Sequence, residues 1–99
     1  MPTNYVRGRN FEYARMKAWR KAGYTVVRTA GSHGPWDIVA VRSDRPSECI
    51  QCKRVENEAI ALRLIKEFKA NPLLNPSGYF HQVIEVYCSA TREVLRGTV

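Results

Sequence analysis

Residues 30–54 read AGSHGPWDIVAVRSDRPSECIQCKR, and this stretch decides the fold. Two runs rich in apolar and β-branched residues, WDIVAVR at 36–42 and ECIQCKR at 48–54, flank the segment SDRPS at 43–47. Aspartate, proline and serine favour turns, so the pattern predicts an antiparallel hairpin with a five-residue turn. The loop before the hairpin holds two glycines and a proline, which suits a close approach to a ligand.

Polar side chains are expected to converge at the open end of this hairpin. Side chains alternate across a strand, so Gln51 and Lys53 share one face of the second strand, and Asp37 at the start of the first lies across from them. Oxygen atoms of Asp37 and Gln51 suit Mg²⁺ or Mn²⁺, and Lys53 suits orienting a water or stabilising charge on a phosphate. The pattern favours metal-dependent phosphodiester hydrolysis. The alternative is an ordinary polar rim on a hairpin.

An amphipathic helix is predicted over residues 7–22, followed by Gly23 as a stop. Glu12 lies in a row with Met16 and Trp19, which directs its carboxylate toward the sheet. Geometry alone leaves two interpretations open, a site carboxylate or a surface glutamate paired with Arg9 or Arg15. The expected apolar stripe is Phe11, Ala14, Ala18, Trp19 and Ala22, and the expected basic face includes Arg9, Lys17, Arg20 and Lys21.

The remaining segments alternate between strand and helix patterns. YTVVRT at 24–29 predicts a first strand, and a second helix is expected from the N-cap Asn57 to about residue 70. The proline-containing stretch 71–78 is expected to end that helix, and strands are predicted at 79–88 and 91–96. The order α-β-β-β-α-β-β predicts an α/β fold, a mixed central sheet flanked by helices, in one domain spanning 1–99.

The motifs GSHGPWDIVAV and CIQCKR, preceded by a helix with Glu12, resemble the archaeal-type (Hjc-like) Holliday-junction resolvases, including phage-encoded relatives. These enzymes are members of the PD-(D/E)xK nuclease superfamily, and the resemblance covers roughly residues 8–96. It departs at two positions: Trp36 directly precedes the aspartate, with the proline one place earlier, and Gln51 stands at the usual acidic position. Glu48 is a poor substitute because its side chain is expected on the opposite face.

The resemblance implies a restriction-endonuclease-like fold and a Holliday-junction resolvase that uses Mg²⁺ or Mn²⁺. Asp37, Glu12 and Gln51 would bind the metal, with the backbone carbonyl of Cys52 as a further ligand. Lys53 would assist the attacking water or the transition state. In-line attack would leave 5′-phosphate and 3′-hydroxyl ends.

Two loop residues complete the candidate site. The resemblance gives Ser32 a role in catalysis or in holding the DNA backbone, although Ser32 equally suits a turn cap. His33 is a candidate for phosphate contact or proton transfer, against the alternative of an exposed loop histidine.

The charge balance points to a polyanionic partner. Sixteen lysines and arginines against nine acids give a net charge of +7, which favours nucleic acid over a membrane surface. Charge alone would also suit a ribosomal or architectural protein. Phosphate contacts position rather than specify, so recognition is expected to depend on junction shape. The candidate contacts are Arg7, Arg9, Lys17, Arg28 and Arg54, with Ser32 and His33.

Three cysteines, Cys49, Cys52 and Cys88, are expected to be reduced packing residues. The C-x-x-C spacing invites a zinc or redox interpretation, but within a strand it places the two sulfurs on opposite faces. No run approaches the roughly 18 apolar residues of a membrane helix, and no signal region opens the chain. A cytoplasmic protein is therefore expected, in the host cell if the chain is viral.

A homodimer is expected because Tyr79, Phe80 and the apolar side of the second helix exceed what one small core hides. The resembled resolvases are two-fold dimers, and a four-way junction offers two symmetric strands to cut. The alternatives are another PD-(D/E)xK nuclease that acts on duplex, flap or mismatched DNA, or a non-catalytic junction-binding module, which the neutral Gln51 favours.

Overall fold

The computed structural model describes residues 4–29 and 35–99. Its elements follow the predicted order, so the α/β prediction is confirmed. Within the described ranges, no helix is long and apolar enough to cross a membrane. The elements are α1 (Asn4–Lys21), β1 (Thr25–Arg28), β2 (Ile38–Arg42), β3 (Arg45–Val55), α2 (Glu58–Ala70), β4 (Phe80–Cys88) and β5 (Glu93–Thr98).

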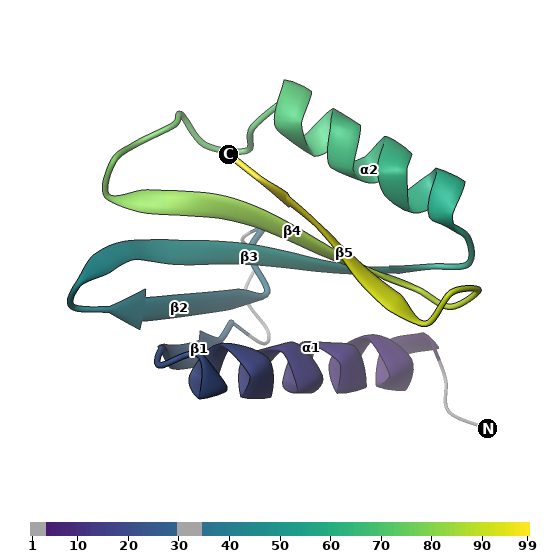
Figure 1. Ribbon diagram of the computed structural model, residues 1–99, viewed down its shortest axis with the longest axis horizontal. Coiled ribbons are helices and arrows are strands. Elements are labelled where there is room, and N and C mark those ends of the chain that lie inside the picture. Colours follow the sequence, from purple (N-terminus) through teal and green to yellow (C-terminus); the bar gives the residue numbers. More distant parts are fainter. Residues whose placement is uncertain (1–3, 30–34) are drawn as a thin grey trace.

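The strands form one five-stranded sheet in the order β1-β2-β3-β4-β5 (Figure 1). All neighbours pair antiparallel except β3 and β4, which are parallel. A parallel pair needs a crossover connection, and α2 provides it. The strand that carries Gln51 and Lys53 is therefore the middle strand of the sheet.

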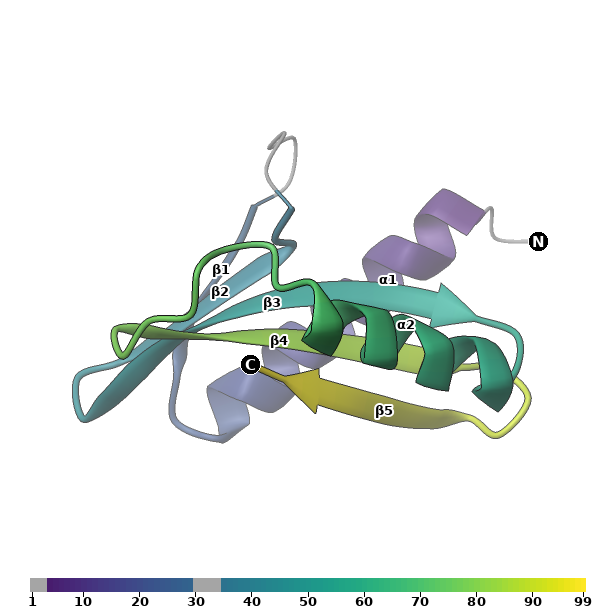
Figure 2. The same ribbon diagram turned by 90° about the horizontal axis from the view of Figure 1, so that it is seen from above.

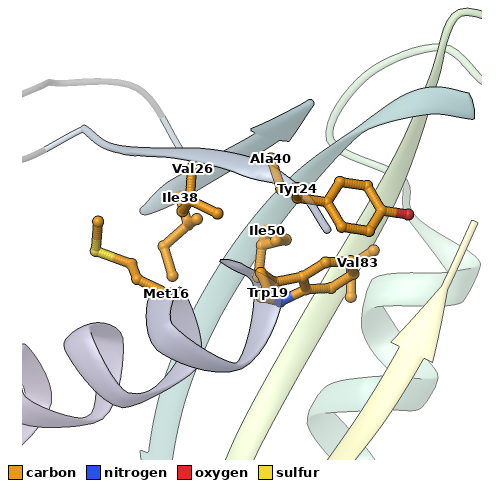
Figure 3. Packing of buried hydrophobic residues seen from close by; sticks show 8 residues of the cluster. All are labelled: Met16, Trp19, Tyr24, Val26, Ile38, Ala40, Ile50 and Val83. Carbon is orange, nitrogen blue, oxygen red and sulfur yellow. The ribbon is translucent and has the colours of Figure 1, made fainter. Parts of the chain in front are cut away.

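The two helices cover opposite faces of the sheet (Figure 1). Helix α1 packs against β1, β2 and β3, whereas α2 lies along β4 and β5 and also contacts β3 (Figure 2). On the α1 face, the side chains shown in Figure 3 form one buried cluster: Met16, Trp19, Tyr24, Val26, Ile38, Ala40, Ile50 and Val83. On the α2 face the cluster consists of Ala61, Ile65, Phe68, Ile84 and Val86.

The helix ends have the predicted local causes. Gly23 follows α1 with a φ of 98°, which glycine adopts without strain, and its N–H donates to Arg20 O at 2.9 Å. Asn57 caps α2 because its Oδ1 accepts from Ile60 N at 3.0 Å. One detail of α1 was predicted wrongly. Ala14 and Ala22 are exposed, and the buried stripe runs through the larger Phe11, Met16 and Trp19.

The predicted five-residue turn of the hairpin is wrong. Only Ser43 and Asp44 separate β2 from β3, and Pro46 lies inside β3. Proline is tolerated there because β4 pairs with β3 only from Ser47 onward. Asp44 accepts two hydrogen bonds from the Arg42 guanidinium, at 3.0 Å each, and these stabilise the tight turn.

The last strand also differs from its prediction. It runs from Glu93 to Thr98, two residues later than expected at each end. Residues 89–92 form the turn, in which Arg92 has a φ of 58° and donates its N–H to Cys88 O at 2.8 Å. Strand alternation alone does not reveal where such a turn stops.

Candidate active site

Asp37 lies directly before β2, in the gap where the β2–β3 ladder ends. The register pairs Ile38 with Ile50, and Asp37 N donates to Ile50 O at 2.9 Å. The half-buried Asp37 carboxylate accepts from Cys52 N at 2.8 Å through Oδ2. Strand pairing therefore fixes the carboxylate beside the central strand, across from Gln51.

The segment before Asp37 is held on two sides. Thr29, directly after β1, donates its N–H to Asp37 O at 3.0 Å and its hydroxyl to Trp36 O. Gln51 Nε2 donates to Pro35 O at 3.3 Å. The Trp36 ring packs edge-on against Phe68 of α2, with 6.3 Å between ring centroids. Proline and tryptophan at these positions thus anchor the approach to Asp37.

Glu12 reaches the same region from α1. Its Oε1 accepts from Arg28 Nε at 3.2 Å, and the side chains are only 19% and 18% exposed. Burial and then the negative charge of Asp37 raise the pKa of Glu12, while Arg28 opposes the rise. The effect of Asp37 indicates that the two carboxylates are close enough for their charges to interact. Glu12 therefore forms this ion pair with Arg28 and not with Arg9 or Arg15, the two partners that the surface interpretation predicts.

Gln51 and Lys53 lie on the other face of β3, toward α2. Both line a pocket of about 340 Å³ whose wall includes Leu64 and Phe68 of α2. Lys53 is exposed, and no ion pair holds it within the described ranges. Its ammonium group is accessible to a substrate.

Cys52, between these two residues, faces α1 and packs against its core cluster. Burial raises the pKa of its thiol well above the usual range, and the charges of Glu85, Asp37 and Glu12 raise it further. The thiol therefore stays protonated and is no thiolate ligand. In a strand the N–H and C=O of one residue point to the same side, so the Cys52 carbonyl also faces the Asp37 gap. Its role as a ligand stays a prediction.

A buried carboxylate beside the site was missed from the sequence. Glu85 on β4 is fully buried, pairs with Cys52 in the sheet register, and accepts bonds from Arg15 and Arg96 at 2.8–3.2 Å and from Trp19 Nε1 at 3.0 Å. Burial raises its pKa, but these hydrogen bonds outweigh that effect and lower it overall. The sequence feature that could have indicated a buried Glu85 is its position as a single acid within the apolar run VIEVYC.

The predicted DNA-contacting residues fall into separate places. Arg7 of α1 and Arg54 of β3 line a shared pocket of about 440 Å³, together with Glu56 and Ser89. The Arg54 guanidinium lies 4.6 Å from the centre of the Tyr87 ring, a cation–π contact that orients it. Arg28 is instead the ion partner of Glu12, and Lys17 is exposed on α1. Arg9 also belongs to α1. Ser32 and His33 lie outside the described residues.

Residues 4–71, from α1 to just past the end of α2, match a family model. The match makes the chain a nuclease of the PD-(D/E)xK superfamily. Its family is the one described as restriction endonuclease (Mrr_cat), and the chain belongs to it; the fold is accordingly restriction-endonuclease-like. No curated protein matches the sequence. The reaction of this class is hydrolysis of DNA phosphodiester bonds.

PD-(D/E)xK nucleases generally use Mg²⁺ or Mn²⁺. Such hard cations prefer carboxylate, amide and carbonyl oxygens, which Asp37, Glu12 and Gln51 offer. Across the described ranges, no group of three or more acidic, histidine or cysteine side chains could hold a metal ion. Burial is the main cause of the raised pKa of Glu12, and the charge of Asp37 adds to it; a cation near both carboxylates would offset that repulsion. The residues fit a divalent cation held by two carboxylates.

Proposed function

We propose that the protein is a homodimeric, metal-dependent endonuclease that resolves four-way DNA junctions by paired symmetric nicks. The observation that carries the nuclease chemistry is the interaction between the charges of Asp37 and Glu12 at the end of the hairpin that also holds Lys53. The resemblance of the hairpin motifs to Holliday-junction resolvases supports the choice of substrate. A DNA substrate implies action inside a cell, in the host cytoplasm if a virus encodes the chain.

Each side chain has a distinct task in this proposal. Asp37 and Glu12 provide the charged ligands for the cation, and Gln51 adds a neutral amide oxygen. Arg28 holds the Glu12 carboxylate in place and opposes the rise in its pKa that burial and Asp37 cause. Lys53 stabilises the negative charge that grows on the phosphate. A bound Mg²⁺ or Mn²⁺ supplies Lewis-acid activation of the phosphate and water.

The pocket between Arg7 and Arg54 suits a backbone phosphate of the bound strand. Arg54 follows Lys53 on β3, but side chains alternate across a strand, so the Arg7–Arg54 pocket lies on the α1 face and Lys53 on the α2 face. The contact with Tyr87 limits the motion of the guanidinium before DNA arrives. Contacts of this kind read the backbone, which is consistent with selection by junction shape.

The dimer is proposed from the apolar surface and the symmetry of the substrate. Leu62, Leu73 and Leu74 are 42–53% exposed, and Tyr79 is 88% exposed. A second copy would cover part of this surface and would present two sites to the two equivalent strands of a junction. Sedimentation or light scattering of the protein alone tests the stoichiometry.

The central experiment compares a labelled four-way junction with a linear duplex of the same sequences, in Mg²⁺, in Mn²⁺ and in chelator. Wild type is expected to nick the junction symmetrically, and Asp37→Asn to remove cleavage while keeping the acceptor for Cys52 N. Glu93→Gln, an exposed change of equal charge on β5, is the matched control. Binding without metal-dependent cleavage by wild type would refute the catalytic proposal.

Two alternatives have specific support. The restriction endonuclease family favours a nuclease that also cuts duplex DNA, which equal cleavage of the two substrates would reveal. The neutral Gln51 favours a junction-binding module without activity. Tight binding to the junction without cleavage in either Mg²⁺ or Mn²⁺ would identify such a module.

A further inference from the structure

The outer side of α1 is an exposed surface that carries basic residues and no acid. Its members recur every three or four positions, so they share one side of the helix, and they form what we call the α1 outer face: Asn10, Tyr13, Ala14, Lys17, Arg20 and Lys21. Glu12, the one acid in the sequence of α1, bonds Arg28 of β1 instead. Figure 1 shows α1 as the outer layer on its side of the sheet.

The cations of the α1 outer face are not neutralised within the described residues. Lys17, Arg20 and Lys21 are exposed, and none of them takes part in an ion pair there. The two buried acids on the same side of the sheet, Glu48 and Glu85, have hydrogen-bond partners of their own. The positive charge of this face is therefore available to a partner.

This charge pattern is unfavourable for the free helix. Lys17 and Lys21 lie one turn apart, and like charges at this spacing destabilise a helix. The helix dipole favours cations in the last turn, which accounts for Arg20 and Lys21 but not for Lys17. A polyanion bound along the helix would relieve the repulsion.

Helix α2 offers a comparison within the same molecule. Its exposed basic residues Arg63, Lys66 and Lys69 are mixed with the exposed acids Glu58 and Glu67. Arg63 and Glu67 lie one turn apart with opposite charges, a spacing that supports a helix. The basic excess of the two helices is thus concentrated on α1.

We propose that the α1 outer face binds the phosphate backbone of a duplex arm of the DNA substrate, outside the candidate active site. The proposal rests on the proposed function for the identity of the polyanion. From Asn10 to Lys21 the face is roughly 16 Å long at 1.5 Å per residue. That length matches about five nucleotides of one strand of a duplex. No residue of the face lines the pocket of Lys53 or bonds Asp37, so its task is to hold DNA.

An anionic membrane is the main rival partner for a basic helix. A helix that binds a membrane inserts its apolar side between the lipids. In α1 the apolar residues Phe11, Met16 and Trp19 are buried in the protein, so they are not available for insertion. The burial of this side favours DNA.

Fluorescence anisotropy of a labelled four-way junction, in chelator and at several salt concentrations, tests the proposal. The α1 variant combines Lys17→Gln, Arg20→Gln and Lys21→Gln. The control variant removes the same charge from exposed positions of α2: Arg63→Gln, Lys66→Gln and Lys69→Gln. Thermal unfolding verifies the fold of both variants.

The α1 variant is expected to bind the junction about tenfold more weakly or worse. The slope of log affinity against log salt should fall by about 2–3, since each phosphate contact contributes about 0.9 to it. The α2 variant should keep the wild-type slope. Wild-type affinity in the α1 variant, or equal losses in the two variants, overturns the proposal.

Two further comparisons identify the partner. Longer junction arms should strengthen binding by wild type more than binding by the α1 variant, and an equal gain would contradict a contact with the arms. Vesicles of anionic lipid are the third probe. If they bind wild type but not the α1 variant, while both proteins bind the junction equally, the face belongs to a membrane and the proposal is wrong.

Nicking of the junction by wild type separates this inference from the proposed function. If wild type nicks the junction and the α1 variant binds it as tightly, only the role of the α1 outer face is wrong. If the α1 variant alone loses affinity and wild type nicks with neither Mg²⁺ nor Mn²⁺, the inference stands and the catalytic proposal fails.

Discussion

Lys53 is the only lysine on the hairpin, and its charge has no partner in the described part of the chain. Lys53→Met is expected to slow single-turnover cleavage by about 10²- to 10³-fold, the usual loss when a group that stabilises transition-state charge is removed. Because the side chain is exposed, the melting temperature should hardly change. Lys66→Met, an exposed change on α2, is the control. Unaltered cleavage by Lys53→Met would contradict the assignment.

Glu12 is expected to destabilise the metal-free fold at neutral pH. Burial and Asp37 raise its pKa above the ordinary 4.5, so the native state binds this proton more tightly than the unfolded chain does. Stability is therefore lost as pH rises through that range, and Glu12→Gln avoids the loss. The gain should be small, below about 1 kcal/mol, because the ion pair with Arg28 offsets part of the penalty.

Thermal unfolding in chelator at pH 4 and pH 7 tests this expectation. Glu12→Gln should raise the melting temperature more at pH 7 than at pH 4. A variant that is less stable than wild type at pH 7 would show that the Arg28 ion pair dominates.

The sequence predicts the hairpin part of the candidate active site, whereas the parts that depend on helix packing could not be predicted. Strand alternation placed Gln51 and Lys53 on one face and put Asp37 opposite them, because a hairpin is a local structure. The partnership of Glu12 with Arg28 depends on how α1 crosses β1, and the pocket that lies beside Gln51 and Lys53 depends on the crossover of α2. Neither is encoded in local spacing, so side-chain partners remained out of reach of the sequence.

At the scale of elements, replacing either of two glycines by alanine is expected to change the stability of the fold in opposite directions. A Cβ on Gly97 of β5 would lie 2.6 Å from Ile65 Cγ2, so Gly97→Ala forces α2 away from the sheet and is expected to cost about 1–3 kcal/mol. A Cβ on Gly8 of α1 meets nothing within 4 Å. Gly8→Ala is expected to stabilise by about 0.4–1 kcal/mol.

Urea unfolding of the two variants checks both signs in one experiment. Equal effects of Gly8→Ala and Gly97→Ala would show that the close approach of α2 to β5 relaxes without cost. Activity is a useful second readout for Gly97→Ala, because α2 also carries Glu67 and Phe68 into the pocket beside Lys53.

Element order was predictable because each helix and strand has a clear local period and stop signal, such as Gly23 and Asn57. The hairpin turn was predicted too long because Pro46 looks like a turn residue. Its place in β3 is set by where β4 begins to pair, which is a tertiary property. Ala14 and Ala22 fitted the helical period, yet the larger Met16 and Trp19 fill the space against the sheet.

At the scale of the whole molecule, Glu85 connects α1, β4 and β5 through Arg15, Trp19 and Arg96. Glu85→Gln is expected to cost about 3 kcal/mol, since it leaves two guanidinium groups without their shared carboxylate. The lowered pKa of Glu85 means that this stability is present above its ordinary value of 4.5 and is lost as pH falls below it.

Thermal unfolding from pH 3 to pH 7 measures this contribution. The difference between wild type and Glu85→Gln should be largest at neutral pH and should shrink in acid, with Glu93→Gln as an exposed control on β5. A difference that stays constant with pH would show that packing of Glu85, and not its charge, provides the stability.

The parallel pairing of β3 with β4 also bears on how the molecule folds. The β1–β2 and β2–β3 pairs join residues that are close in sequence, whereas the first β3–β4 pair joins Ser47 to Phe80 across the whole crossover. Closing that long loop costs conformational entropy before the β3–β4 contacts form and offset it, and such non-local steps limit folding rates. We therefore expect a nascent hairpin that already brings Asp37 beside Cys52, while the pocket around Lys53 is completed only when α2 and β4 dock in the slowest step.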